Sequence, residues 1–170
     1  VEAIKIMNES LTESPRAYGY CMLSSVYINC DQNDNAISSC NTAIALDPDY
    51  EEAYFLLGEA LKDKSSQESI KYYRKAIQLD PDYQLAWQAL GFKLIAKDVT
   101  IVEGISALRK AIELNPDDPW SQIYIANALW RTGNIEEADM WYKSAISISP
   151  ESSDFRKWYD EFLEREKFDQ

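Results

Sequence analysis

Four copies of one eight-residue phrase recur along the 170-residue chain, with starts 33, 35 and 34 residues apart. A period of about 34 residues is typical of stacked helix–turn–helix units. Each phrase begins with apolar residues spaced like the last turn of an amphipathic helix and then reaches a proline. Because proline disfavours helix in the residue before it, each phrase closes one helix ahead of the next. The copies are Ala43–Tyr50, Ala76–Tyr83, Ala111–Asp118 and Ala145–Ser152.

The acidic residues that follow these prolines are candidates to begin the next helix. Asp49, Asp82 and Asp118 each carry a short carboxylate, which can accept hydrogen bonds from the first N–H groups of a helix. Pro119 suits a first helical position. We therefore expect each phrase to serve as the end of one helix and the start of another.

The motifs between the phrases identify a family. Trp87-x-x-Leu90-Gly91-x-x-Leu94 carries the aromatic, leucine and small residue of a first helix, and Ala138-x-x-x-Tyr142 carries the small and aromatic pair of a second. With these motifs the chain resembles the tetratricopeptide-repeat (TPR) proteins. The resemblance implies an all-α, right-handed superhelix in a single domain, residues 1–170. It implies repeats at 17–50, 51–83, 84–118 and 119–152, a half-repeat helix at 1–16 and a capping helix at 153–170.

The two ends of the chain carry the additional helices. Residues 2–13 have the spacing of a second repeat helix, so the sequence starts half-way through a unit, and we expect a fragment that lacks an upstream segment. The tail places aromatic and aliphatic residues on one stripe and charges on the other face, as an end cap of a solenoid requires. That stripe consists of Phe155, Trp158, Tyr159, Phe162 and Leu163.

The composition excludes several classes of function. A net charge of −12 and a pI of about 4.4 argue against nucleic acid and against anionic membrane surfaces, although the charge can also serve solubility alone. No apolar run is long enough for a membrane span. Three cysteines without zinc-type pairing fit a reducing compartment, and we expect a cytoplasmic protein in which Cys21 and Cys40 are buried.

The chain lacks residues that most catalytic sites require. It has no histidine, which removes the commonest general base and every Ser-His or Cys-His pair. Asp31-x-Asn33-x-Asn35 imitates the start of a calcium loop, but Ala36 stands where such a loop needs glycine. The sequence therefore predicts a non-catalytic protein without cofactor or metal.

In the resembled family, the first helix of each repeat lines a concave groove that binds partners. Counting from each repeat's start predicts a groove rich in aromatic and aliphatic residues, unless curvature or the half-repeat buries some of them. The clamp of Lys, Asn and Arg that binds Hsp70 and Hsp90 C-terminal tails is absent, because Leu56, Leu85 and Ala89 occupy such positions. The candidate partner-binding residues are Tyr18, Met22, Asn29, Phe55, Leu56, Glu59, Leu85, Phe92, Trp120, Tyr124, Asn127 and Arg131.

These residues lead to one favoured function and two alternatives. The favoured function is a protein–protein interaction scaffold that binds an apolar, neutral-to-basic peptide. One alternative is a chaperone that holds an apolar segment of a secreted or assembling client. The other is weak self-association through residues 99–102 or through the N-terminal face.

Overall fold

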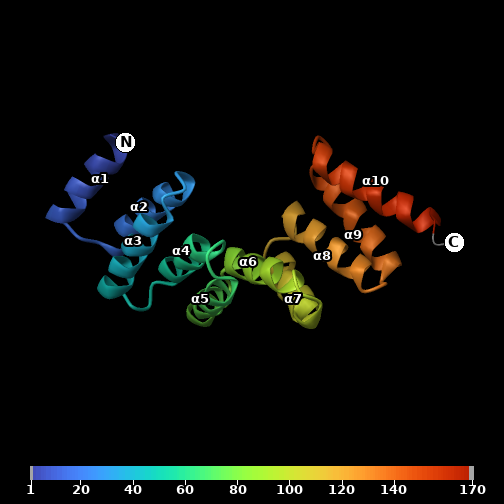
Figure 1. Ribbon diagram of the computed structural model, residues 1–170, viewed down its shortest axis with the longest axis horizontal. Helices are drawn as coiled ribbons and strands as arrows, with labels where there is room; N and C mark the ends of the chain where they lie inside the picture. Colours follow the sequence, from blue (N-terminus) through green and yellow to red (C-terminus); the bar gives the residue numbers. More distant parts are fainter. Residues whose placement is uncertain (1, 169–170) are drawn as a thin grey trace. The chain divides into compact units, whose positions relative to one another are not determined.

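The computed structural model describes residues 2–168, and within that range the chain forms ten α-helices, one 3-10 turn and no strand (Figure 1). The predicted all-α fold is confirmed. Val1, Asp169 and Gln170, which belong to the predicted terminal segments, lie outside the described residues. The elements are α1 (Glu2–Glu13), α2 (Ala17–Asn29), α3 (Asn33–Leu46), α4 (Glu51–Leu61), α5 (Ser66–Leu79), α6 (Gln84–Ile95), η1 (Asp98–Thr100), α7 (Ile101–Leu114), α8 (Pro119–Arg131), α9 (Ile135–Ile148) and α10 (Ser153–Phe168).

Consecutive helices pack in pairs, α2 with α3, α4 with α5 and α8 with α9 (Figure 1). Glycines allow close approach of helices, as Gly58 and Gly91 illustrate. A Cβ atom on Gly58 of α4 would lie 2.5 Å from the Tyr73 ring of α5. On α6, a Cβ atom on Gly91 would lie 2.6 Å from Leu108 Cγ and 3.0 Å from the Gly104 carbonyl oxygen of α7. Glycine is needed at both positions because no side chain fits between the two helices.

The helix starts agree only in part with the predicted capping. Asp118 caps α8, because its carboxylate accepts hydrogen bonds from the N–H groups of Trp120 and Ser121. Asp49 and Asp82 do not cap helices, and that prediction is wrong. Instead, the aspartate just before the proline accepts a hydrogen bond from the backbone N–H of the predicted capping residue. In the first case, Asp49 N donates to Asp47 Oδ1 at 3.1 Å. A short carboxylate two residues upstream forms a tight side-chain turn, which leaves the next aspartate exposed.

The segment after α6 contains residues 99–102, one of the two regions considered above for self-association. Asp98–Thr100 forms the short 3-10 turn and α7 begins at Ile101, whose side chain is buried. Val99 and Val102 on either side of it are 97% and 72% exposed. The segment is therefore a helix start that buries one of its three aliphatic residues.

The chain forms two compact units, Val1–Ala86 and Trp87–Gln170, which divide within α6. The core of the first unit is filled mainly by small side chains and leucines, namely Cys21, Cys40, Ala43, Ala53, Leu56 and Leu57. The burial of Cys21 and Cys40 was predicted and is confirmed. The core of the second unit contains larger residues, among them Ile123, Ile125, Tyr142, Phe155 and Phe162.

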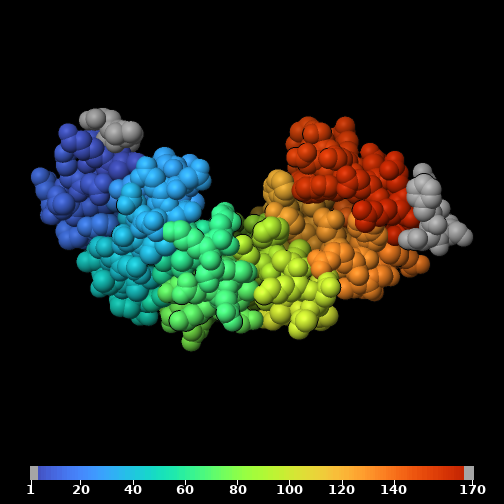
Figure 2. Space-filling model, viewed as in Figure 1, coloured from blue at the N-terminus to red at the C-terminus, as the bar shows by residue number. Residues whose placement is uncertain are grey.

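The C-terminal helix α10 packs against α9 in the second unit, where Figure 2 shows the red segment against the orange one. Phe155 and Phe162 are buried, and the Phe162 ring lies 5.1 Å from the Tyr142 ring and 5.6 Å from the Trp130 ring. The stripe read from the sequence therefore faces the core.

Candidate functional site

An aromatic patch lies on the second unit, formed by Phe92, Trp120, Tyr124 and Trp158. The Phe92 ring of α6 is 4.7 Å from the Tyr124 ring of α8. Trp120, one helical turn before Tyr124, places its ring 6.1 Å from Tyr124 and 6.2 Å from Trp158 of α10. Phe92 and Trp120 remain 45% and 44% exposed. Contiguous exposed apolar side chains of this kind mark interaction sites on soluble proteins.

The patch rests on a buried ring and offers the Tyr124 hydroxyl as a polar group. The Trp120 ring meets the buried Phe155 ring edge-on at 5.0 Å, and this contact on its buried side fixes the tryptophan. Burial raises the pKa of the Tyr124 phenol, and Asp118 raises it further, so the hydroxyl stays protonated near neutral pH. Within residues 2–168 this hydroxyl makes no hydrogen bond, so it can donate one to a ligand.

The two predicted polar contacts on α8 are engaged within the chain. Asn127 donates to the Ile123 carbonyl oxygen at 3.0 Å and accepts from the Tyr142 hydroxyl at 2.6 Å. Arg131 donates to the Ile95 carbonyl oxygen and to Asp98, 2.5 Å in each case. These bonds hold α8 to α9 and to the segment that follows α6, so the two side chains position the site.

The predicted residues of the first unit form no comparable ring cluster. Tyr18 and Met22 of α2 are exposed one turn apart, and Asn29 and Leu85 are also exposed. The Phe55 ring is half-buried and meets the Tyr83 ring edge-on at 5.2 Å. Glu59 accepts a hydrogen bond from Tyr73 at 2.7 Å and pairs with Lys62 at 3.2 Å.

The structure corrects one predicted site residue, Leu56, whose side chain is only 7% exposed and belongs to the core of the first unit. Helix α4 packs against α2, α3 and α5, and such enclosure leaves only a narrow stripe of the helix free. Cys21 and Ile123 occupy similar groove positions by counting and are fully buried for the same reason. Among the counted positions of the second unit, Phe92, Trp120 and Tyr124 stay at least partly open.

Sequence reasoning missed Trp158 as a site residue. It was assigned to the cap, yet its ring completes the patch beside Trp120. The signal was present in the tail, because a capping helix that follows α9 occupies the place of a first helix in a further repeat. Counting the groove positions into residues 153–168 would have included it.

Neither metal-binding nor membrane-spanning elements were found among residues 2–168. No group of three or more His, Cys, Asp or Glu side chains converges on a point where a metal ion could bind. None of the described helices has both the length and the apolar character that crossing a membrane requires. Asp31, the first residue of the calcium-like segment, adopts a φ of 55° in the turn before α3.

Family models match three stretches of the chain and together span about half of it. The model described as "TPR repeat" matches residues 25–65, and the model described as "Tetratricopeptide repeat" matches residues 51–83 and 125–152. No curated protein matches the sequence significantly. With paired helices, close glycine contacts and these matches, the chain belongs to the tetratricopeptide-repeat family, whose members are generally non-catalytic protein–protein interaction modules.

Solved structures of the same fold support this assignment. A crystal structure of MamA is similar with a TM-score of 0.75 and 25% identity, and the match covers 88% of each chain. TTC0263, a thermophilic TPR protein of Thermus thermophilus, has a TM-score of 0.76 and 21% identity over 95% of this chain and 89% of its own. YrrB, described as a TPR protein with an unusual peptide-binding site, has a TM-score of 0.74 and 19% identity over 88% and 77%.

Proposed function

We propose that the aromatic patch binds an apolar peptide segment of a partner protein and that the chain thereby acts as a scaffold. The observation that carries this proposal is the contiguity of the patch, in which Phe92, Tyr124 and Trp120 follow one another at ring distances of 4.7 and 6.1 Å. Aromatic side chains on a firm base lose little entropy on binding and commonly dominate the energy of an interface.

The surroundings of the patch favour a neutral-to-basic ligand. The chain carries 29 acidic and 17 basic residues, and Asp118 lies close enough to Tyr124 to raise its pKa. Lysine or arginine in the ligand therefore gains from the field of the protein, whereas an acidic peptide is repelled. The Tyr124 hydroxyl can donate to a backbone carbonyl of the ligand and so fix its direction. The peptide-binding site named for YrrB supports a peptide as the ligand class.

The test uses a display library of peptides that combine aromatic or aliphatic residues with lysine, selected on the wild-type chain. The best binder is then titrated into Phe92→Ala, Tyr124→Ala and the double variant. Each single change should cost about 2 kcal/mol, roughly a 30-fold weaker Kd. Added salt should weaken binding only mildly, because the apolar contribution is not screened.

The matched control is Val99→Ala with Val102→Ala, which removes exposed aliphatic groups of the same unit outside the patch. This variant should bind the selected peptide like the wild type. Circular dichroism establishes that all variants remain helical. Unchanged binding to the Phe92→Ala, Tyr124→Ala variant, or equal losses in the control, would place the ligand elsewhere.

A further inference from the structure

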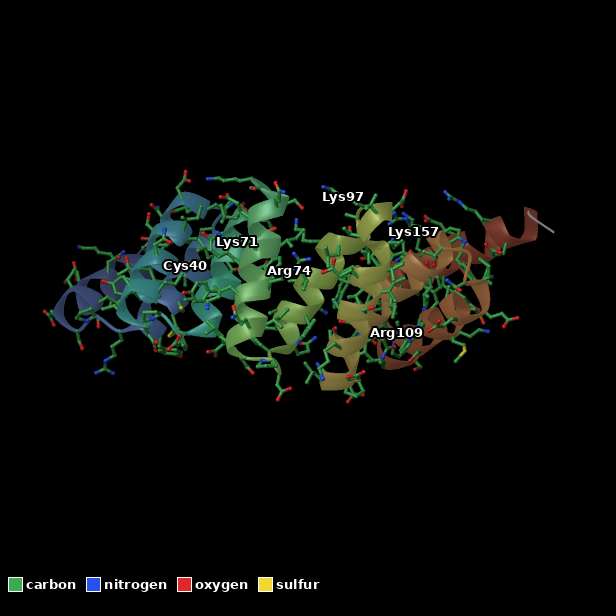
Figure 3. All side chains as sticks on the ribbon, turned by 90° about the horizontal axis from the view of Figure 1, so that it is seen from below. Cys40, Lys71, Arg74, Lys97, Arg109 and Lys157 are labelled. Carbon is green, nitrogen blue, oxygen red and sulfur yellow. The ribbon has the colours of Figure 1, made fainter. Side chains whose placement is uncertain are left out.

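A basic stripe runs along α5 in the first unit, formed by Lys71, Arg74 and Lys75. Lys71 and Arg74 are labelled in Figure 3. Their spacing of i, i+3 and i+4 places all three side chains on one face of the helix. Like charges at this spacing repel one another and destabilise a helix by a few tenths of a kcal/mol each. A cluster of cations on one face is therefore unexpected in a chain with a net charge of −12.

The lysines of the stripe differ from three lysines elsewhere in the chain that have carboxylate partners on their own helix or beside it. Lys62, Lys110 and Lys143 pair with carboxylates three or four residues away along the chain, at 3.2, 3.4 and 2.7 Å. Among the described side chains of residues 4–166, neither Lys71 nor Lys75 has a carboxylate within ion-pair distance. Their ammonium groups lie instead over tyrosine rings, 5.7 Å from the centroid in each case.

Those rings are held in place beside the stripe. Lys71 lies over Tyr72 of the same helix, and Lys75 lies over Tyr54 of α4. The Tyr54 hydroxyl donates to the Pro48 carbonyl oxygen at 3.0 Å, which fixes the ring. The Tyr54 side chain is half-buried, so one part of its ring remains accessible.

Stripe and rings together line a shallow cleft between α4 and α5 of about 440 Å³. Ammonium groups stand beside aromatic faces in it, so it can accept a carboxylate and an apolar side chain at the same time. Its lining consists of Tyr54, Lys71, Tyr72, Arg74, Lys75 and Gln78. We propose that this cleft binds an acidic segment of a partner protein, with two or more carboxylates next to an aromatic or aliphatic residue.

Charge and geometry favour a short acidic segment over other anions. Nucleic acid and anionic bilayers extend their charge over a wide surface, and a protein of net charge −12 repels them. A short acidic segment interacts mainly with the charges of the stripe, because the field of more distant acidic residues is screened beyond about 8 Å at physiological salt. The stripe lies in the middle of α5, where backbone N–H groups are already bonded within the helix, so the amide cradle of a phosphate site is missing.

This inference goes beyond the proposed function. The aromatic patch lies on the second unit and favours neutral-to-basic ligands, whereas the cleft lies wholly on the first unit and favours acidic ones. Opposite charge preferences on separate units would let the chain bind two different partners.

The test compares two fluorescein-labelled peptides by anisotropy, one in which Glu pairs alternate with Phe and one in which Gln replaces every Glu. The wild type should prefer the Glu peptide by about tenfold at low salt and lose the preference at high salt. Lys71→Glu with Lys75→Glu should abolish the preference. The matched control is Lys110→Glu with Lys143→Glu, which changes the net charge by the same amount at lysines that already have carboxylate partners. This control should retain the preference for the Glu peptide.

Three outcomes would overturn the proposal. The wild type could show no preference for the Glu peptide, or both double variants could lose it equally, which would indicate a general effect of net charge. Sedimentation equilibrium addresses a third outcome, a salt-sensitive dimer lost in the Lys71→Glu, Lys75→Glu variant, which would assign the cleft to a second copy of the chain. Circular dichroism checks that both variants stay folded, and Phe92→Ala should leave the Glu preference unchanged.

Discussion

The cores of the two units are filled differently, although both are built from paired repeat helices. The core cluster of the first unit consists of cysteine, alanine and leucine, whereas that of the second unit also contains isoleucine, phenylalanine and tyrosine. An aromatic side chain buries roughly 150–250 Å². Because the free energy of burial grows with apolar area, the second unit should resist unfolding more strongly than the first.

The surfaces of the units differ as well. In the second unit, the exposed rings join into one patch against α10. In the first unit, the exposed apolar side chains Tyr18, Met22 and Leu85 form no ring cluster, and the distinctive feature is the basic stripe of α5. One repeat architecture thus carries two surfaces of different chemistry, because the function of a fold depends on the side chains placed on it.

The largest expected effect is on the aromatic core of the second unit. Phe162→Ala removes a buried ring that lies 5.1 Å from Tyr142 and 5.6 Å from Trp130, and it should lower the free energy of unfolding by about 3–5 kcal/mol. Hydrogen exchange should show the loss in α8–α10 and leave the protection of α2 and α3 unchanged, because repeats stabilise their neighbours only.

The control for this prediction is Met140→Ala on α9, where a 68% exposed side chain is removed from the same unit and little change is expected. Equal loss of protection in α2 and α3 after Phe162→Ala would contradict the division into units, because it would mean that the whole chain unfolds together.

A smaller effect tests a feature that both units share, a close helix–helix contact at a glycine. Gly91→Leu should destabilise by about 1–3 kcal/mol, because the new side chain meets Leu108 and the Gly104 carbonyl oxygen. Gly58→Leu should do the same in the first unit, where the obstacle is the Tyr73 ring. Denaturant titration measures both, with Ser106→Leu on the exposed side of α7 as a control. If only one of the two leucine variants is as stable as the wild type, the helices of the two pairs are not equally close.

The sequence predicted the helices more fully than the site. The period and the prolines determine where each helix ends, since Pro48, Pro81, Pro116 and Pro150 cannot continue a helix. Whether a groove position is open depends on how many neighbours enclose it. Phe55 and Leu56 are adjacent in the sequence, yet only Leu56 is buried among α2, α3 and α4. No single-helix pattern contains that information, and the same holds for the cleft, which requires Tyr54 of α4 beside Lys75 of α5.

The smallest effect concerns the two terminal helices, which are attached by different chemistry. In the first unit, α1 contacts α2 through a neutral hydrogen bond from Asn8 Nδ2 to the Tyr27 hydroxyl, 3.2 Å long. In the second unit, the Tyr159 hydroxyl of α10 donates to the Asp139 carboxylate of α9 at 2.7 Å, and Lys143 donates to the same carboxylate. Only the attachment of α10 therefore depends on an ionised group.

Acid should consequently weaken the attachment of α10 before that of α1. Burial raises the pKa of Asp139, but hydrogen bonds from Lys143 and Tyr159 outweigh it, so the pKa lies below its ordinary value of 3.8. A carboxyl group with a lowered folded-state pKa stabilises the fold above its unfolded-state pKa, and this contribution disappears as the pH falls through the folded-state pKa. The contribution is below about 1 kcal/mol, because the Asp139–Lys143 pair is partly exposed.

The measurement compares the wild type with Asp139→Asn, which keeps an acceptor for Tyr159 but cannot ionise. The difference in the free energy of unfolding between the two proteins should be present at neutral pH, and it should disappear as the pH falls through the folded-state pKa of Asp139, which lies below 3.8. NMR shifts of α10 amides should differ between the two proteins at neutral pH and converge as the pH falls through the folded-state pKa of Asp139, whereas α1 amides should titrate alike in both proteins. A difference that persists at low pH would show that charge plays no part in holding α10. The contrast between the terminal helices would then rest on their packing alone.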